Sequence, residues 1–308
     1  MRLAVLSGGV GGARFLRGVL DVIEPTDVTI VGNVGDDLEI LGLHVSPDLD
    51  SILYALSGLS DEERGWGRAD ETWNALASAA DLGGDAWFRL GDRDIGLHLV
   101  RSQLLREGRP LSSVTAHLAR AAGLECTLLP ASDNPLRTFV ETPAGTFAFQ
   151  TWFVARGHQD DVDAVHVTGA PEAAPAPGVL DALADADLIV ITPSNPYVSI
   201  GPILAVAEIR EALEDRSAPC VAVSPLIGGR AVKGPADRML ERMAGGTSPA
   251  HLAACYAGLI DVLIIDEADA QAELPTDVRT VVTRTLMTDD EARRRLARAV
   301  IDAAGSPA

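Results

Sequence analysis

The fold is decided by residues 3–13, LAVLSGGVGGA. The apolar run Leu3 to Leu6 predicts a buried strand, and the glycines after it predict a turn into a helix over residues 13–23. Glycines let the backbone approach an anion, and the free N–H groups of a helix start face it. Arg14 occupies the third glycine position of a dinucleotide fingerprint, and the Gly-Lys-Ser/Thr of a P-loop is missing. The stretch therefore predicts a phosphate-binding turn of a less common kind, or a turn that only connects strand to helix.

Further apolar runs extend this pattern along the chain. Residues 28–31 predict a second strand, and the short continuous runs 188–191, 220–223 and 262–265 are typical of strands buried on both faces. Helical patterns separate them, which indicates βαβ units. The predicted fold class is α/β, with a Rossmann-like, mostly parallel sheet, helices on both of its faces and a mixed, largely helical insertion.

The middle of the chain breaks the alternation. Residues 50–123 have a helical pattern, and the segments 138–141 and 146–153 flank Pro143-Ala144-Gly145 as a hairpin would. We expect residues 1–50 and 165–308 to form a nucleotide-binding core, and residues 51–164 to form an insertion that covers one end of the sheet. The Pro- and Ala-rich stretch 169–178 is the best linker candidate.

Composition narrows the function classes. The 308 residues include 44 acidic and 25 basic ones, a net charge of −19 that repels nucleic acid. Cys126, Cys220 and Cys255 are too widely spaced for a disulfide framework or a zinc site, and Lys233 is the one lysine. No apolar run approaches the ~20 residues of a membrane span, and the N-terminal residues do not resemble a signal peptide. We therefore expect a cytoplasmic protein with no nucleic-acid or membrane partner.

Acidic residues cluster after the second predicted strand. Asp36 and Asp37 come after a four-residue connection, Gly32 to Gly35, and Asp48 and Asp50 come shortly after. Four carboxylates at the carboxyl end of a sheet repel one another unless a cation offsets them, and Mg²⁺ binds one or two carboxylates together with substrate phosphates. One of the later pair could instead cap the helix that residues 52–56 predict. The group as a whole predicts a magnesium site, with Asp36 and Asp37 the first candidates for ligands and Asp48 the next.

Two polar loops leave predicted strands in the second half of the chain. Ser194 and Asn195 follow the strand at 188–191, and Ser224 to Gly228 follow the strand at 220–223. Ligands of open α/β sheets bind beyond such strand ends, where hydroxyl, amide and backbone N–H groups suit a phosphate, a ribose or a base edge. Each loop alone could be an ordinary turn with a helix cap.

The predicted insertion carries aromatic residues and a histidine without an obvious task. Composition favours Trp66, Trp73 and Trp87 as core anchors rather than ligand stackers. Asp92 is predicted to cap the helix that starts there. His98 reads as a packing or surface residue, not a metal ligand.

Seven motifs together resemble one family, the 2-phospho-L-lactate transferases of coenzyme F420 biosynthesis. The resemblance extends from the first strand to the last helix and rests on matching order and spacing. The motifs are GGVGG (8–12), NVGDD (33–37), SPDLD (46–50), LGDRD (90–94), PSNP (193–196) with SIG (199–201), SPLIG (224–228) and TLMT (285–288).

The resemblance implies a reaction and a set of contacts. Family members transfer a phosphorylated three-carbon acid from a guanosine diphosphate-linked donor to the terminal ribityl hydroxyl of the deazaflavin Fo, release GMP, require Mg²⁺ and form homodimers. It implies that Asp50 and Arg89 contact Fo. It also implies that the donor's guanosine diphosphate portion lies on the glycine turn and the two polar loops, at Gly9, Gly11, Gly12, Ser194, Asn195, Ser224 and Gly228. A primary alcohol is a poor nucleophile, so we expect Asp50 to orient or deprotonate it.

Two other classes remain as alternatives. A non-catalytic regulator of the same superfamily that binds a nucleotide sugar would share the glycine turn and acidic loop, but would not need the motifs at 48–50 and 91–94. A nicotinamide dehydrogenase fits less well, because the fingerprint is broken and no acid ends the second strand. The sequence does not distinguish phospholactate, phosphoenolpyruvate and phosphoglycerate as the transferred acid, although bacterial relatives often use phosphoenolpyruvate.

Overall fold

A seven-stranded parallel sheet forms the centre of the computed structural model, which describes residues 1–305. Every neighbouring pair in it is parallel. This confirms the predicted α/β class and makes the sheet more uniform than expected. The strands, in spatial order, are β14 (Arg279–Thr283), β13 (Val262–Asp266), β10 (Cys220–Val223), β9 (Leu188–Ile191), β1 (Leu3–Ser7), β2 (Val28–Gly32) and β5 (Thr127–Pro130).

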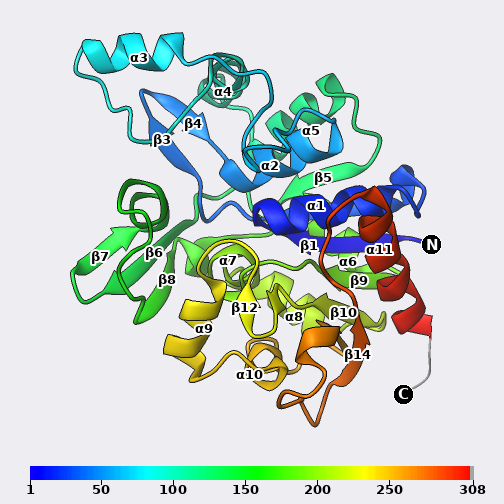
Figure 1. The fold of residues 1–308 in the computed structure, drawn as a ribbon. Coiled ribbons are helices and arrows are strands. Elements are labelled where there is room, and N and C mark those ends of the chain that lie inside the picture. The colour runs from blue at the N-terminus through cyan, green and yellow to red at the C-terminus, as the bar shows by residue number, and fades with distance from the viewer. Residues whose placement is uncertain (306–308) are drawn as a thin grey trace.

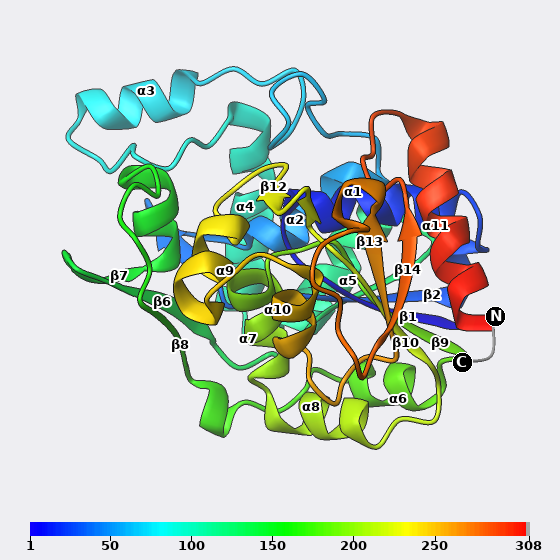
Figure 2. The same ribbon diagram turned by 60° about the horizontal axis from the view of Figure 1, so that its bottom comes forward.

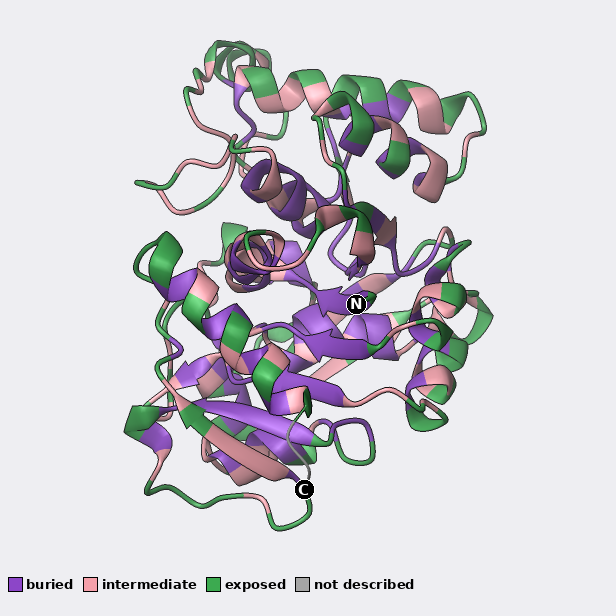
Figure 3. Cartoon of the chain, turned by 90° about the vertical axis from the view of Figure 1, so that its right-hand side faces the viewer, coloured by how far each residue is buried: buried purple, intermediate pink, exposed green. Residues whose placement is uncertain are grey.

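Helices cover both faces of this sheet (Figures 1 and 2). On one face, α1 packs against both α2 and α11, and on the other α6 and α8 pack together. Figure 3 shows the strands buried between helices whose outer sides are exposed. The helices are α1 (Gly9–Leu20), α2 (Pro47–Leu56), α3 (Asn74–Asp81), α4 (Asp92–Arg106), α5 (Leu111–Ala121), α6 (Val179–Ala184), α7 (Gly201–Leu204), α8 (Ala207–Glu214), α9 (Ala236–Ala244), α10 (Pro249–Ala254) and α11 (Asp290–Gly305).

The apolar runs predicted the main strands well. The residues of β1, β9, β10 and β13 are all buried, as expected for continuous runs in the middle of a parallel sheet. The helix after the glycine turn begins at Gly9, not at residue 13, because the glycines themselves form its first turn. Among residues 1–305, no helix is both long and apolar enough to cross a membrane.

The region 51–164 holds α3, α4 and α5, but also β5, which pairs with β2 at the edge of the central sheet. The predicted hairpin is present, and its second strand is shorter than expected: β6 (Arg137–Thr142) pairs with β7 (Gly145–Ala148), and the chain then enters a π-helical turn, η2 (Thr151–Ala155). Strand β8 (Ala164–Thr168) adds to the other side of β6. The stretch 169–178 is a connection that contains the short 3-10 turn η3 (Ala170–Glu172).

The strand order creates a crevice between β1 and β9. The chain moves from β1 to β2 and β5 on one side, and later to β9, β10, β13 and β14 on the other. The loops that leave β1 and β9 therefore diverge, which is the usual ligand site of an open α/β sheet. The remaining short elements lie in connections: β3 (Leu38–Ile40), β4 (Leu43–Val45), β11 (Leu226–Ile227), β12 (Arg230–Ala231), η1 (Pro25–Asp27), η4 (Pro196–Ile200) and η5 (Glu267–Asp269).

Candidate active site

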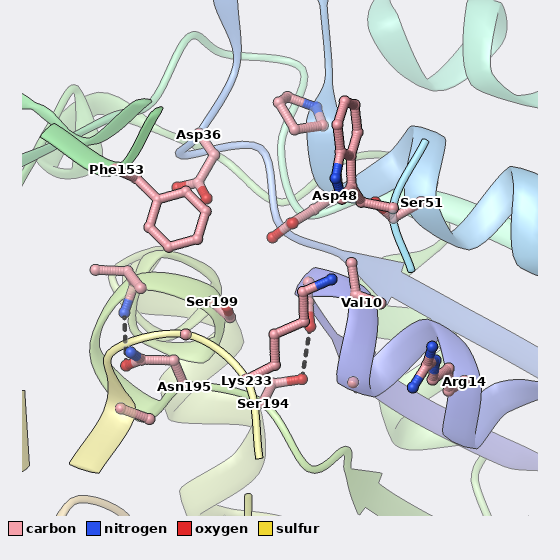
Figure 4. A pocket seen from close by; sticks show the side chains of 18 of the residues that line it. Val10, Arg14, Asp36, Asp48, Ser51, Phe153, Ser194, Asn195, Ser199 and Lys233 are labelled. Carbon is pink, nitrogen blue, oxygen red and sulfur yellow. Dashed lines mark hydrogen bonds between the residues drawn. The ribbon is translucent and has the colours of Figure 1, made fainter. Parts of the chain in front are cut away.

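A cavity of about 560 Å³ lies beyond the carboxyl ends of β1 and β9. This volume is within the range of sites for small ligands and cofactors. Its wall comes from the glycine turn, α2, the insertion, the loops after β9 and β10, and the segment before α9 (Figure 4). The predicted site residues that line it are Gly9, Gly11, Asp36, Asp48, Asp50, Arg89, Ser194, Asn195 and Ser224, whereas Gly12, Asp37 and Gly228 do not.

Glycine is required in the turn after β1 by close packing. Gly9 has a φ of +68°, which glycine adopts without strain. A Cβ on Gly11 would lie 2.6 Å from the carbonyl oxygen of Pro193, so the start of α1 packs directly on the loop after β9. Gly12 faces inward, where a Cβ would collide with the hydroxyls of Ser7 and Thr192. Gly12 thus supports the turn from behind.

Asp36 and Asp48 form an acidic pair at the cavity wall, and both are buried. Burial and the neighbouring Asp48 charge hold the pKa of Asp36 well above its usual range, although Asn33 opposes the shift. Burial raises the pKa of Asp48 to about 6 against hydrogen bonds from Asn33 and the Gly9 amide. The Oδ1 atom of Asp36 has no hydrogen-bond partner among the described residues. The pair is therefore short of positive charge.

Asp37 faces away from the cavity although it adjoins Asp36. Its Oδ2 accepts a hydrogen bond from Ser46 Oγ (3.0 Å) and lies 2.9 Å from His44 Nε2. These contacts tie the β3–β4 hairpin to the start of α2. Among residues 1–305, no group of three or more His, Cys, Asp or Glu side chains is arranged to hold a metal ion. The structure thus places two of the three predicted metal ligands at the cavity.

The pH dependence of stability should report the state of Asp48. Between its ordinary pKa of 3.8 and its folded pKa of about 6, the folded protein binds the proton more tightly than the unfolded chain. The contribution of Asp48 to the free energy of unfolding is complete below pH 3.8 and is lost as the pH rises through about 6. In EDTA, thermal melts should therefore show that the wild type loses more stability than Asp48→Asn between about pH 5 and pH 7.5. Equal losses would contradict this assignment.

Asp50 is held by a buried arginine that the sequence analysis missed. Arg101 on α4 forms a two-pronged ion pair with it: one guanidinium nitrogen donates to Oδ2 at 2.9 Å, and the other donates to Oδ1. Both residues are buried, Asp50 at 5% and Arg101 at 2% exposure. Burial would lower the pKa of Arg101, but the Asp50 charge raises it, so the guanidinium stays charged. The pair fixes the carboxylate while Asp50 still lines the cavity.

The two polar loops contribute unequally. Ser194 Oγ donates to the Gly8 carbonyl (2.6 Å), which joins the loop after β9 to the glycine turn. Asn195 Oδ1 accepts from the amide of Tyr197 (2.9 Å) and so caps η4. Ser224 lines the cavity, but the Gly228 amide is used by Asp269 Oδ2 at 3.0 Å. Gly228 shapes the second loop without facing the cavity.

Three cationic side chains line the cavity: Arg14, Arg89 and Lys233. Lys233 donates to the carbonyl of Gly65 (2.7 Å), and desolvation together with the nearby Arg14 lowers its pKa. Within residues 1–305, neither Arg14 nor Lys233 has a carboxylate oxygen within ion-pair distance. Two like charges without an acidic partner favour an anionic ligand beside them.

Aromatic side chains occupy two parts of the cavity wall. Phe149 and Phe153 are stacked, with ring centroids 5.4 Å apart, and Trp66 and Phe88 line the wall from the insertion. The interpretation of Trp66 as a core anchor is wrong, because it is 38% exposed and faces the cavity. Trp73 and Trp87 are half-buried. Trp87 packs against a small buried apolar cluster of Ile40, Leu43, Val45 and Leu90, as expected of a core anchor.

The guanidinium of Arg89 lies over the ring of Trp73, 5.0 Å from its centroid. Cation–π contact of this kind orients the arginine at the cavity. Asp92 caps a different helix from the one predicted. It accepts from the amides of Asn74 and Ala75 at the start of α3, whereas Glu71 accepts from the first amides of α4.

The parallel sheet, the glycine turn and the acidic pair define an α/β protein of Rossmann-like architecture with a cavity at the carboxyl ends of its strands. A family model described as 2-phospho-L-lactate transferase CofD matches residues 3–304. The chain belongs to this family and is a transferase.

Similar proteins align with this chain over nearly its full length and their own. A phosphoenolpyruvate transferase of Kitasatospora aureofaciens is 46% identical and aligns with 98% of this chain and 97% of its own. One of Mycolicibacterium smegmatis is 41% identical, with 99% of both chains covered. The crystal structure of a UPF0052 family protein of Bacillus halodurans has a TM-score of 0.66 at 18% identity and covers 97% of this chain and 98% of its own. That likeness concerns the fold alone.

Proposed function

We propose that this protein transfers a phosphorylated three-carbon acid from its guanosine diphosphate-linked donor to the ribityl hydroxyl of Fo, releasing GMP. The observation that carries the proposal is one cavity that combines a glycine turn, a buried acidic pair and a fixed carboxylate, Asp50. The names of the relatives favour phosphoenolpyruvate as the acid. We also propose that the protein is cytoplasmic, forms a homodimer and has no nucleic-acid or membrane partner.

The donor fits the side of the cavity formed by the glycine turn and the loops after β9 and β10. Gly9 and Gly11 bring backbone close to a diphosphate, while Ser194, Asn195 and Ser224 offer hydroxyl and amide groups to the nucleoside. Gly12 and Gly228 would not touch the donor, but would allow the backbone of the two loops to take the shape that holds it.

The acidic pair suits Mg²⁺. Asp36 and Asp48 are two buried carboxylates that repel each other, and one of their oxygens lacks a partner. Magnesium is commonly held by one or two carboxylates plus substrate phosphates. When bound, it would neutralise charge on the transferring phosphoryl group. Asp37 would support the pair through its contacts with Ser46 and His44.

Asp50 and the insertion form the acceptor side. The hydroxyl of Fo attacks the phosphorus that carries the three-carbon acid, the new P–O bond forms, and the bond to the GMP oxygen breaks. A carboxylate oxygen of Asp50 accepts the hydroxyl hydrogen and aims its lone pair at phosphorus. The GMP phosphate leaves as an anion that needs no proton. Arg89 and the aromatic wall would hold the flat ring system.

Turnover with defined donors tests this function. Purified protein is incubated with Fo, Mg²⁺ and the phosphoenolpyruvate, phospholactate or phosphoglycerate derivative of guanosine diphosphate, and the products are identified by mass. We expect fastest turnover with the phosphoenolpyruvate donor. Binding of the nucleotide without product from any donor would instead favour a regulator.

Lys233 offers a separate test of the anionic donor. We expect Lys233→Met to raise the KM for the donor on the order of tenfold, because a charged hydrogen bond to an anion is lost. Arg230→Met is the matched control: it removes the same charge from the neighbouring exposed strand β12 without touching the cavity. Equal effects of both variants would show that only the overall charge matters.

A further inference from the structure

Titratable side chains face each other between α2 and α4, beside the apolar cluster that also joins these helices. Asp50 and Tyr54 are four residues apart on α2, and Asp94, His98 and Arg101 share one side of α4. All but Asp94 are at most 5% exposed, and the Asp94 side chain is 14% exposed. We call these five residues the polar ladder.

His98 lies between the two ends of the ladder. One guanidinium nitrogen of Arg101 donates both to Asp50 Oδ2 (2.9 Å) and to His98 Nδ1 (3.2 Å). On the other side of the ring, His98 Nε2 lies 3.1 Å from Asp94 Oδ1, which also accepts from the hydroxyl of Tyr54. Burial alone would raise the pKa of Asp94, but the contacts with His98 and Tyr54 outweigh it and hold that pKa below its usual range. Asp94 is therefore an anionic end point.

These contacts fix the tautomer of His98. Arginine only donates hydrogen bonds, so Nδ1 accepts and carries no proton. The ring proton therefore resides on Nε2, which lies 3.1 Å from Asp94 Oδ1 but outside hydrogen-bond geometry, so this contact is electrostatic. The imidazole of His98 thus lies between Asp94 and the guanidinium that holds Asp50.

The stability of the α2–α4 contact does not require the polar ladder. Replacing a buried ionic group with well-packed apolar residues is often neutral or stabilising, so an interface built only for stability would be apolar. Four of the five residues, all but Arg101, also line the cavity. The ladder therefore lies at the proposed acceptor side of the cavity, and the guanidinium of Arg101 lies on the side of Asp50 that faces away from the cavity.

We propose that His98 is a positioning residue of the transfer reaction. It holds the Arg101 fork in one orientation and, through it, the Asp50 oxygen that receives the acceptor hydroxyl. This inference rests on the proposed function and adds a residue to its acceptor side. Misplacement of a reacting group by about 1 Å can cost on the order of 100-fold in rate, so an indirect role can have a large effect.

Two substitutions test the Nδ1 contact and the Nε2 contact of His98 one at a time. In His98→Asn, the amide oxygen can replace Nδ1 and still accept from Arg101. In His98→Gln, the amide nitrogen can replace Nε2 and reach Asp94, but the acceptor for Arg101 is lost. We expect kcat to fall about 100-fold for Gln and roughly tenfold for Asn, with the KM of the donor unchanged in both. His166→Gln, at an exposed histidine paired with Glu141, is the matched control and should retain wild-type kcat.

A purely structural role predicts a different pattern. The proposal is overturned if both His98 variants have wild-type kcat, or if kcat falls in proportion to the melting temperature in both. The ¹⁵N shifts of the wild-type imidazole provide a readout that needs no turnover: unprotonated Nδ1 with protonated Nε2 supports the ladder, and the opposite tautomer overturns it. A wild-type protein that shows this tautomer but makes no product refutes the proposed function instead.

Discussion

Asp50→Ala should abolish turnover, with a loss on the order of 10³-fold or more, and should also destabilise the protein. The loss of turnover follows from removing the group that orients and receives the hydroxyl hydrogen. The loss of stability follows because Arg101 remains buried without its partner. Removing one member of a buried ion pair typically costs about 3–5 kcal/mol. Chemical denaturation and steady-state kinetics measure the two effects.

The double variant Asp50→Leu with Arg101→Met separates these effects. With both charges replaced by apolar side chains, stability should return to near that of the wild type, while turnover remains lost. Turnover that recovers together with stability would remove Asp50 from the reaction.

Asp48→Asn is expected to stabilise the protein while eliminating magnesium-dependent turnover. The asparagine keeps a hydrogen-bond acceptor for the amide of Asn33 but removes the Asp48 carboxylate. Burial raises the pKa of that carboxyl group from 3.8 to about 6. That shift corresponds to about 3 kcal/mol at neutral pH in the absence of metal, so the variant should be more stable than the wild type by an amount of this order.

Melting in EDTA and with added Mg²⁺ provides the measurement. Mg²⁺ should stabilise the wild type and have a much smaller effect on Asp48→Asn. Glu172→Gln, which removes an acidic charge at a distant exposed turn, is the control. A wild type that is more stable than Asp48→Asn in EDTA would contradict a strained acidic pair.

The sequence predicted the sheet better than the connections. Runs such as 188–191 and 220–223 are buried on both faces, so hydrophobicity alone located β9 and β10. The hairpin segment 146–153 was predicted too long, because β7 ends at Ala148 and the next aromatic residues enter a π-helical turn, where Phe153 stacks on Phe149. Aromatic and β-branched residues suit both environments, and only tertiary packing decides between them.

The candidate site was predictable in outline only. Asp36 and Asp37 are chemically equivalent in the sequence, yet neighbouring side chains point in different directions, and only Asp36 faces the cavity. The Asp50–Arg101 pair joins residues 51 positions apart, which no local pattern indicates. The spacing of Asp94, His98 and Arg101 along one side of a helix was a usable signal, since such a polar stripe is unusual beside a core.

The central claim is that main-chain amides of the glycine turn and a divalent ion on Asp36 and Asp48 together hold the diphosphate. A crystal structure of the protein grown with GDP and Mg²⁺ tests it most directly. We predict the diphosphate against residues 9–12, with the metal bound between it and at least one of the two aspartates. Nucleotide bound elsewhere, or a diphosphate in the cavity with no metal-mediated or direct contact to either carboxylate, would contradict the account.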